Sequence, residues 1–437
     1  MQQLTQESDL NNIMKTQPNY SESILQKRVR RFKSIKRGYY SFIILLSLYL
    51  LSIIAPLFIN SQALIVKYAN EKYDNGETFT DLNQNDKWDV NEPFQDSYKY
   101  YSPAFRDLIE LFITPLHHEG KDFGQYTSFG SPHLGEPDYR LLKKQFEFEN
   151  EGNYIIMPIY PYDPLEDMLS SLSELFDDIN GNGIKDDNEK FYDANDNGKF
   201  DSFNPPTKPG GNHIFGTDNR GRDVFSRLIY GFQISITFAL IVTFFAYSLG
   251  ILIGGTMGYF GGKVDLFGVR IIEIFMAIPF LFLMMIIASL MRPNVVVLAL
   301  ILVFLTGWIG ISFFIRGEFY REKAKDYVSA AISMGQSNIK IMFKHILPNA
   351  LTPIITYAPF AIIGYIGTLV ILDFLGFGLQ PPTPSWGELI SQARENLSAW
   401  HLIVAPLSAM AITLFLITFI GEAVREAFDP KTYSRLR

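Results

Sequence analysis

The chain has 437 residues, of which 48% are hydrophobic and 15% aromatic, and its formal net charge is -7. The charges are segregated, because 29 of the 45 acidic residues lie between positions 61 and 210. Other stretches of about twenty residues carry almost no charge, which excludes an ordinary soluble protein and predicts a membrane protein with one acidic soluble insert. The composition predicts no nucleic-acid partner, and the absence of cysteine excludes disulfides and thiolate metal sites.

Six segments are long enough to cross a hydrocarbon core about 30 Å thick, which needs roughly 20 apolar residues in a helix. They are Tyr39–Ile59, Phe232–Gly258, Ile271–Met291, Val295–Ile315, Leu351–Leu372 and Leu402–Val424. The first follows a polar tail, 1–38, and no small-residue cleavage site closes it. We therefore expect a retained membrane helix at 39–59 rather than a signal peptide.

Basic residues near the ends of the spans predict the orientation. The stretch "QKRVRRFKSIKR" precedes the first span, and the tail 425–437 and the loop 316–350 are also basic. With six crossings, all three fall on the cytoplasmic side. Both termini are therefore predicted to be cytoplasmic, the acidic insert 60–212 to be extracytoplasmic, and a membrane core with five spans to occupy 213–424.

Three segments of the insert share the spacing of a calcium-binding loop, in which oxygen ligands at alternate positions wrap a hard cation. The predicted ligands are Asp81, Asn83, Asn85, Asp89 and Glu92; Asp178, Asn180, Asn182, Asp186 and Glu189; and Asp193, Asn195, Asn197 and Asp201. The first loop lacks the turn glycine and the third lacks the closing Glu, so both should bind more weakly. The alternative is a set of solvated Asn and Asp turns. Three matches favour structural Ca²⁺.

Gly250, Gly254 and Gly258 recur every four residues on the second span and give it a small-residue face for close helix packing. Packing inside the chain is favoured over contact with a second membrane subunit. Glu273, near the end of the third span, is either an intramembrane functional acid or a group that reaches the interface beside Arg270. The second interpretation is favoured.

The stretch from Asp326 to Ala350 predicts two short cytoplasmic helices at an angle. Tyr327, Ala331 and Met334 repeat at helical spacing, and Gly335 interrupts the pattern as a helix C-terminus does. A second helix is predicted after the N-cap Ser337, and Pro348 should end or kink it. Its expected apolar stripe is Ile339, Met342, Phe343 and Ile346, with Lys340 and Lys344 on the wet side. Further along, Ser385 and Glu388 have the spacing of a capping box for a short helix.

The loop from Asp326 to Ala350 resembles the Glu-Ala-Ala loop of ABC-importer permeases, which forms the coupling helices. Ala330, Ala331, Gly335, Leu347 and Pro348 fill the family's places, whereas Ser329 replaces its acidic residue. "KHILPNA" has the form seen in the dipeptide and oligopeptide branch. "FGTDNRGRDVFSRLIYGFQISITFAL", "GYFGGKVDLFGVRIIEIFMAIP" and "LDFLGFGL" look like further family segments. "FIGEAVREAFDP", "YAPF" and "PSWGELI" are closest to the microcin C type of peptide permease, a C-type subunit.

The resemblance implies an all-α membrane protein with six transmembrane helices of the ABC-importer type I permease fold. It implies a permease subunit of an ATP-driven importer for peptides or peptide-like compounds in the inner membrane. The implied partners are a second permease subunit, two ATP-binding subunits, an extracytoplasmic substrate-binding protein and membrane lipid. The two alanines would form the docking face for the ATPase. No G-x-x-x-x-G-K-[ST] motif occurs, so the chain is not expected to be an enzyme, and the permease core is expected to need no cofactor.

Two other functions remain open at this point. An ion-coupled secondary carrier or channel would use buried ionisable residues or broken helices in paired halves, and the spans show few such signals. A membrane-anchored hydrolase could use His117, His118, His133 and His213 of the external segment, but no recognisable hydrolase motif accompanies them. Solvated loop histidines are the favoured interpretation.

Overall fold

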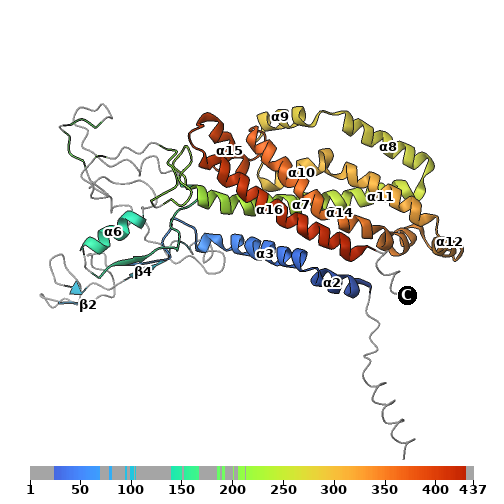
Figure 1. Ribbon diagram of the computed structural model, residues 1–437, viewed down its shortest axis with the longest axis horizontal. Helices are drawn as coiled ribbons and strands as arrows, with labels where there is room; N and C mark the ends of the chain where they lie inside the picture. The colour runs from blue at the N-terminus through green and yellow to red at the C-terminus, as the bar shows by residue number, and fades with distance from the viewer. Residues whose placement is uncertain are drawn as a thin grey trace, which may run out of the picture.

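The computed structural model describes residues 24–68, 78–80, 94–95, 99–102, 104, 139–149, 152–166, 185–187, 189–191, 200, 205–211 and 213–429. Most of the described chain is helical and forms a long bundle, with a smaller unit of strands and one helix at one end (Figure 1). The helices of the bundle are α2 (Ile24–Ser34), α3 (Lys36–Ile53), α7 (Val224–Phe260), α8 (Gly262–Ala277), α9 (Phe280–Leu290), α10 (Val295–Leu302), α11 (Trp308–Lys323), α12 (Asp326–Ser333), α13 (Asn338–Lys340), α14 (Leu347–Phe374), α15 (Trp386–Glu395) and α16 (His401–Phe428).

The smaller unit contains a three-stranded antiparallel sheet. Its strand order is β4-β1-β5, with β1 at Ile65–Tyr68, β4 at Lys99–Tyr101 and β5 at Tyr154–Ile156. Leu142 and Phe146 of α6 (Tyr139–Glu149) pack with Val66 and Ile155 of the sheet in a small apolar core. A separate hairpin pairs β2 (Thr78–Phe79) with β3 (Phe94–Gln95). The expectation of an all-α protein is therefore corrected to a mostly helical one, because part of the insert satisfies its backbone groups by strand pairing.

Four of the described helical stretches are long and apolar enough to cross a membrane, and a bent pair is a fifth candidate. The four are Val224–Phe260, Val295–Lys323, Asn338–Phe374 and His401–Phe428. The six predicted spans are thus only partly matched. The predicted first span, 39–59, overlaps α3, which is not among these candidates and ends at Ile53 because a short 3₁₀ turn, Ala55–Leu57, with Pro56 follows it.

The predicted span Ile271–Met291 is not one continuous helix. The chain forms two helices, α8 and α9, that meet at 68°. Ile278, which precedes Pro279, has an extended backbone with φ -80° and ψ 121°. The proline ring clashes with a helical residue before it and supplies no N–H, so the helix breaks here.

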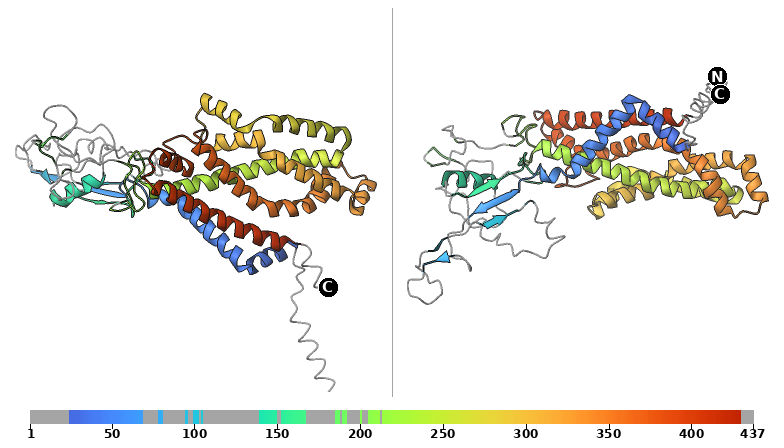
Figure 2. Two further views of the ribbon diagram at one scale, coloured as in Figure 1. Left: turned by 45° about the horizontal axis from the view of Figure 1, so that its top comes forward. Right: turned by 90° about the horizontal axis from the view of Figure 1, so that it is seen from below.

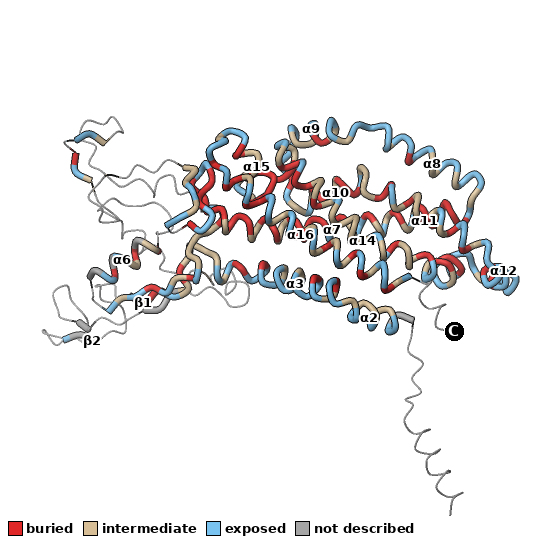
Figure 3. The backbone as a smooth tube through the Cα atoms, viewed as in Figure 1, coloured by how far each residue is buried: buried red, intermediate tan, exposed pale blue. Residues whose placement is uncertain are grey.

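The bundle core lies along α7, which packs against α11 and α14 (Figure 3). Asp223 starts α7 as its N-cap, because its carboxylate accepts the backbone N–H of Ser226 at 2.8 Å. At this end Trp386 of α15 is buried, and its indole N–H donates to the carbonyl of Leu228 at 3.1 Å. The outer faces of α3, α8 and α9 expose large apolar side chains, as helices that face lipid do.

Candidate functional site

The segment predicted to couple the chain to an ATPase lies at the end of the bundle opposite the sheet unit (Figure 1). α12 ends at Ser333, and Gly335 follows with φ +71°. The N–H of Gln336 donates to the carbonyl of Ala331 at 3.2 Å, which closes the helix end. Gly335 is suited to this left-handed position, which a side chain makes costly.

The second predicted short helix is part of a much longer one. From Asn338 the chain stays helical through α13, a π-helical turn at Ile341–Ile346 and α14 as far as Phe374. Pro348 neither ends the helix nor separates it from the span. Proline has no backbone N–H to donate, and the wider π-turn just before Pro348 accommodates this missing hydrogen bond. Ser337 lies at the predicted N-cap, but its side chain makes no capping hydrogen bond.

The π-turn also changes which side chains are buried. Met342 and Ile346 of the predicted stripe are buried, whereas Ile339 and Phe343 are exposed by 71% and 46%. Because a π-turn holds more residues than an α-turn, the 3.6-residue stripe does not continue through it. Ile339, Met342 and Phe343 instead border an apolar cavity of about 190 Å³, whose other walls are Ile251, Leu252, Thr256, Phe260 and Phe319.

The two alanines of the loop differ in exposure. Ala330 is exposed, but Ala331 is 1% exposed and packs with Val328, Ile341 and Ile346. Of the two alanines expected to form the docking face, only Ala330 is exposed. Ala331 instead lets α12 pack closely on the helix that follows. Leu347 is half-buried and Pro348 exposed at the start of α14.

A polar clamp that the sequence did not reveal holds α12 in place. Glu322 is 2% exposed and accepts hydrogen bonds from Lys325 and from the Tyr327 hydroxyl, each at 2.8 Å. Burial and this carboxylate raise the pKa of Tyr327 to about 12, so its hydroxyl stays protonated at neutral pH. The amide of Asn349 donates to the same hydroxyl at 3.3 Å. The clamp thus joins the end of α11, α12 and the start of α14.

The glycine face of α7 lies against α11. An added Cβ would lie 1.8 Å from a side-chain carbon of Ile311 at Gly250, 2.2 Å from the carbonyl oxygen of Ser312 at Gly254 and 2.6 Å from that of Arg316 at Gly258. Only glycine permits this approach, which is packing inside the chain. Glu273 pairs with Arg270 at 2.6 Å on an exposed surface.

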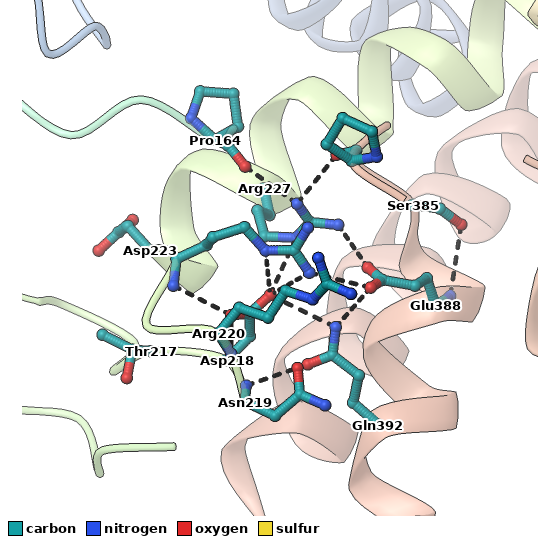
Figure 4. A network of polar contacts seen from close by, with 12 residues as sticks. Pro164, Thr217, Asp218, Asn219, Arg220, Asp223, Arg227, Ser385, Glu388 and Gln392 are labelled. Carbon is teal, nitrogen blue, oxygen red and sulfur yellow. Dashed lines mark hydrogen bonds and ion pairs between the residues drawn. The ribbon is translucent and has the colours of Figure 1, made fainter. Parts of the chain in front are cut away.

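A buried network of charged groups lies at the other end of the bundle, where α7 begins (Figure 4). Arg222 binds Asp218 through its Nε at 2.8 Å and Glu388 through its Nη2 at 3.0 Å. Arg227 also pairs with Glu388. Burial alone would lower the pKa of Arg222, but the carboxylates of Asp218 and Glu388 outweigh it and raise that pKa. Two cations and two anions balance one another, so the network stays charged inside the protein.

The predicted capping box is half right. The Ser385 hydroxyl accepts the N–H groups of Gly387 and Glu388, at 3.1 and 3.4 Å, and starts α15. The Glu388 carboxylate does not cap this helix, because it binds the two arginines. Ser385 also donates to Asp373 at the end of α14, so three helices, α7, α14 and α15, meet at this network.

The network extends into the sheet unit. The Ser226 hydroxyl donates to the carbonyl of Tyr162 at 2.7 Å, and Arg227 donates to that of Pro164 at 2.9 Å. The carboxylate of Asp223 is hydrogen-bonded to the Tyr160 hydroxyl at 2.7 Å and to the imidazole Nδ1 of His213 at 2.8 Å. His213 is 9% exposed, so its interpretation as a solvated loop histidine is wrong. The other three histidines of the external segment lie outside the described residues.

Most of the predicted calcium ligands also lie outside the described residues, and only Asp186 and Glu189 are placed. The backbone N–H of Asp186 donates to the Glu189 carboxylate at 3.0 Å, and the N–H of Glu189 donates to the carbonyl of Asp186 at 3.0 Å. In the described part of the chain no three His, Cys, Asp or Glu residues are grouped as metal ligands. Calcium binding stays a prediction.

Comparison with known proteins gives consistent matches. Residues 250–433 match the family described as "Binding-protein-dependent transport system inner membrane component". The chain is 33% identical over 431 residues, 98% of each chain, to the "Peptidoglycan transport system permease protein YejE" of Agrobacterium fabrum. The 437-residue chain therefore belongs to this family of ABC transport permeases. The resemblance seen in the coupling loop is thus confirmed.

Two further relatives define the branch of this permease family. The chain is 33% identical to the "Inner membrane ABC transporter permease protein YejE" of Escherichia coli, over 93% of this chain and 96% of the relative. It is 37% identical to the "Oligopeptide transport system permease protein OppC" of Haemophilus influenzae, over 51% of this chain and 71% of the relative. The full-length alignments include the insert, so the insert has a counterpart in the YejE proteins.

Family membership establishes the general role. The permease is a multi-pass inner-membrane component of a binding-protein-dependent ABC transporter. ATPase activity lies in partner subunits, and the family implies both ATPase and binding-protein partners. The carrier and hydrolase alternatives are thereby set aside.

Proposed function

We propose that this permease is the C-type subunit of an ATP-driven importer for peptides or peptide-like compounds. Its relatives carry peptidoglycan and oligopeptide transport names, which supports this substrate class. In the proposed assembly it works beside a second permease subunit, two ATP-binding subunits and an extracytoplasmic binding protein. It has six spans, with α3 as the first and the bent pair α8–α9 as the third.

The observation that carries the mechanism is the continuous helix from Asn338 to Phe374. It begins at the coupling segment and ends at the buried network, at opposite ends of the bundle (Figure 1). The segment is helical throughout and packs against α7, α11 and α16, so its two ends are mechanically connected even where Pro353 and Pro359 allow it to bend. A displacement of α12 by an ATPase would therefore reach the far end of the protein along this helix.

The proposed input is α12. It packs on the rest of the chain through Val328 and Ala331, and it exposes Ala330 and Met334. The Glu322 clamp and Gly335 fix its angle to the long helix. A small exposed face of this kind permits close approach of a partner. The residues proposed to act in coupling are Ala330, Gly335, Leu347 and Pro348, and the buried Ala331 supports them from below.

The proposed output lies at the network. Asp373 ends the long helix and accepts the Ser385 hydroxyl, while Glu388 of the same short helix α15 binds Arg222 and Arg227. A movement of the long helix would thus be passed to α15 and to the start of α7. We place this end, with the insert 60–212, on the extracytoplasmic side, and α12 with both chain termini on the cytoplasmic side.

A glycine substitution tests the coupling role. Gly335→Leu should leave the permease inserted but separate ATP hydrolysis from uptake, because a side chain at φ +71° strains the corner between α12 and the long helix by about 1–2 kcal/mol. The assay compares ATP hydrolysis with labelled peptide uptake in proteoliposomes that hold the complete transporter. Gly364→Ala is the matched control, since Gly364 lies inside α14 with open space around it.

Normal uptake by the Gly335→Leu transporter would contradict the coupling assignment. The assembly itself is tested by purification from the native membrane in a mild detergent, followed by mass spectrometry of stoichiometric partners. We expect ATP-binding chains and a second permease. Recovery of the folded chain alone would contradict the proposed assembly.

A further inference from the structure

We infer that α2 forms a binding surface for the headgroups of anionic phospholipids at the cytoplasmic face of the membrane. The segment from Ile24 to Gly38 holds seven basic residues and no acidic one: Lys27, Arg28, Arg30, Arg31, Lys33, Lys36 and Arg37. Such a density of positive charge beside a membrane span attracts anionic lipid. The structure adds where these charges point.

One face of α2 is used inside the protein. Arg28 donates to the Thr352 hydroxyl of α14 at 3.2 Å, and its guanidinium lies 4.8 Å from the centre of the Phe428 ring. Arg31 pairs with Glu426 at 3.9 Å. These contacts hold α2 across the ends of α14 and α16, so its orientation is fixed by the protein rather than by lipid.

Of the other cations in this segment, Arg37 pairs with Glu422 of α16 at 3.3 Å. Lys27 and Lys33 are exposed on α2, and Lys36 is exposed at the first turn of α3. None of these three ammonium groups has an acidic partner among the described residues of the chain. Lys27, Arg30 and Lys33 are exposed and follow one another at intervals of three residues, so they form one strip about 120° wide on the side of α2 away from Arg28.

The position of α2 matches the headgroup layer. A single residue, Ile35, separates α2 from α3, and the two helices meet at an angle there (Figure 2). The apolar part of α3 starts within two turns of Lys36, so the lysines lie close to the edge of the hydrocarbon. Val29 and Phe42, exposed by 46% and 41%, provide apolar surface beside them. Basic and apolar groups together on one helix are typical of a membrane-surface segment.

Anionic lipid is favoured over an acidic protein partner because the charged face continues directly into an apolar membrane helix. A protein partner would need to displace lipid headgroups to reach it. Since Arg28 reaches Thr352 in the second turn of α14, lipid bound on α2 would also support this part of the long helix.

The test measures lipid binding to the purified full-length chain by native mass spectrometry, with phosphatidylglycerol and phosphatidylcholine as probes. The wild type should bind phosphatidylglycerol more tightly. Lys27→Gln, Lys33→Gln and Lys36→Gln together should reduce that affinity by about fivefold for each lysine removed. The control replaces Lys143 and Lys144 of α6 and the exposed Lys190 by Gln, and its affinity should equal that of the wild type.

Insertion is checked separately. The chain has no cysteine, so Ser34→Cys provides a single site for a membrane-impermeant maleimide, which should react only from the cytoplasmic side in both the wild-type and the triple-lysine background. Equal affinity of the wild type for the two lipids, or an unchanged phosphatidylglycerol affinity in the triple variant, would overturn the inference. Loss of a co-purifying partner with lipid affinity intact would assign the surface to that partner instead.

Discussion

Replacing Glu388 by Gln should destabilise the permease by breaking the charge balance of the network at the start of α7. The side chains of Arg222 and Arg227 are 1% and 0% exposed, and that of Glu388 is 11% exposed. In the Glu388→Gln variant, the Asp218 carboxylate is left to balance the two buried guanidinium groups of Arg222 and Arg227. Removing one partner of a buried ion pair costs about 3–5 kcal/mol, and the amide keeps the shape of the acid, so we expect about 3 kcal/mol.

The assay is thermal unfolding of the purified chain in detergent, followed by tryptophan fluorescence, to which Trp386 at the start of α15 contributes. For a membrane core of this size, about 3 kcal/mol corresponds to a fall of roughly 6–12 °C in the melting temperature. Glu273→Gln is the matched control, because its pair with Arg270 is exposed on both sides and contributes about 0–1 kcal/mol.

A second substitution separates charge imbalance from lost packing. Adding Arg222→Met to Glu388→Gln returns the network to one cation and one anion, and it should recover part of the lost stability. If Glu388→Gln melts within a degree of both the wild type and the Glu273→Gln control, the network does not hold the three helices together. No recovery in the double variant would show that packing, rather than charge balance, dominates.

Two further predictions concern packing and metal binding. Gly254→Ala should lower the free energy of unfolding by about 1–3 kcal/mol, because the added Cβ would lie 2.2 Å from the Ser312 carbonyl oxygen. Gly364→Ala is the control. Equal melting temperatures of the two variants would refute the close approach of α7 and α11. Chelation of calcium should lower the melting temperature of the wild type but not that of a variant with Asp178→Asn and Asp186→Asn, and an unchanged wild type would argue against the calcium loops.

Much of the coupling segment could be predicted from its residues. Gly335 marked a helix end because few other residues tolerate a positive φ, and the structure has φ +71° there. Glu273 was expected beside Arg270, and the structure pairs the two at 2.6 Å. By contrast, the burial of Ala331 and the exposure of Ile339 could not be predicted, because both depend on how α12 packs against the helix that follows it.

The buried network shows why pairwise contacts escape sequence reasoning. Glu388 has the spacing of a capping residue, and nothing local distinguishes that role from binding Arg222, which lies 166 residues earlier. His213 gave no sign of its hydrogen bond to Asp223 either, although only ten residues separate them. Groups that are polar and isolated in sequence become partners only when three helices bring them to one place.

The sequence by itself determined the membrane class, most of the candidate spans and the permease family, since these depend on local composition and spacing. The tertiary structure decided that the third predicted span is broken, that the second coupling helix is the start of a 37-residue helix, and that this helix ends at a buried ion network. Local patterns encode which segments are helical and apolar. Where a helix bends, which face it buries and which distant charge it meets depend on packing between segments, which a single sequence does not display.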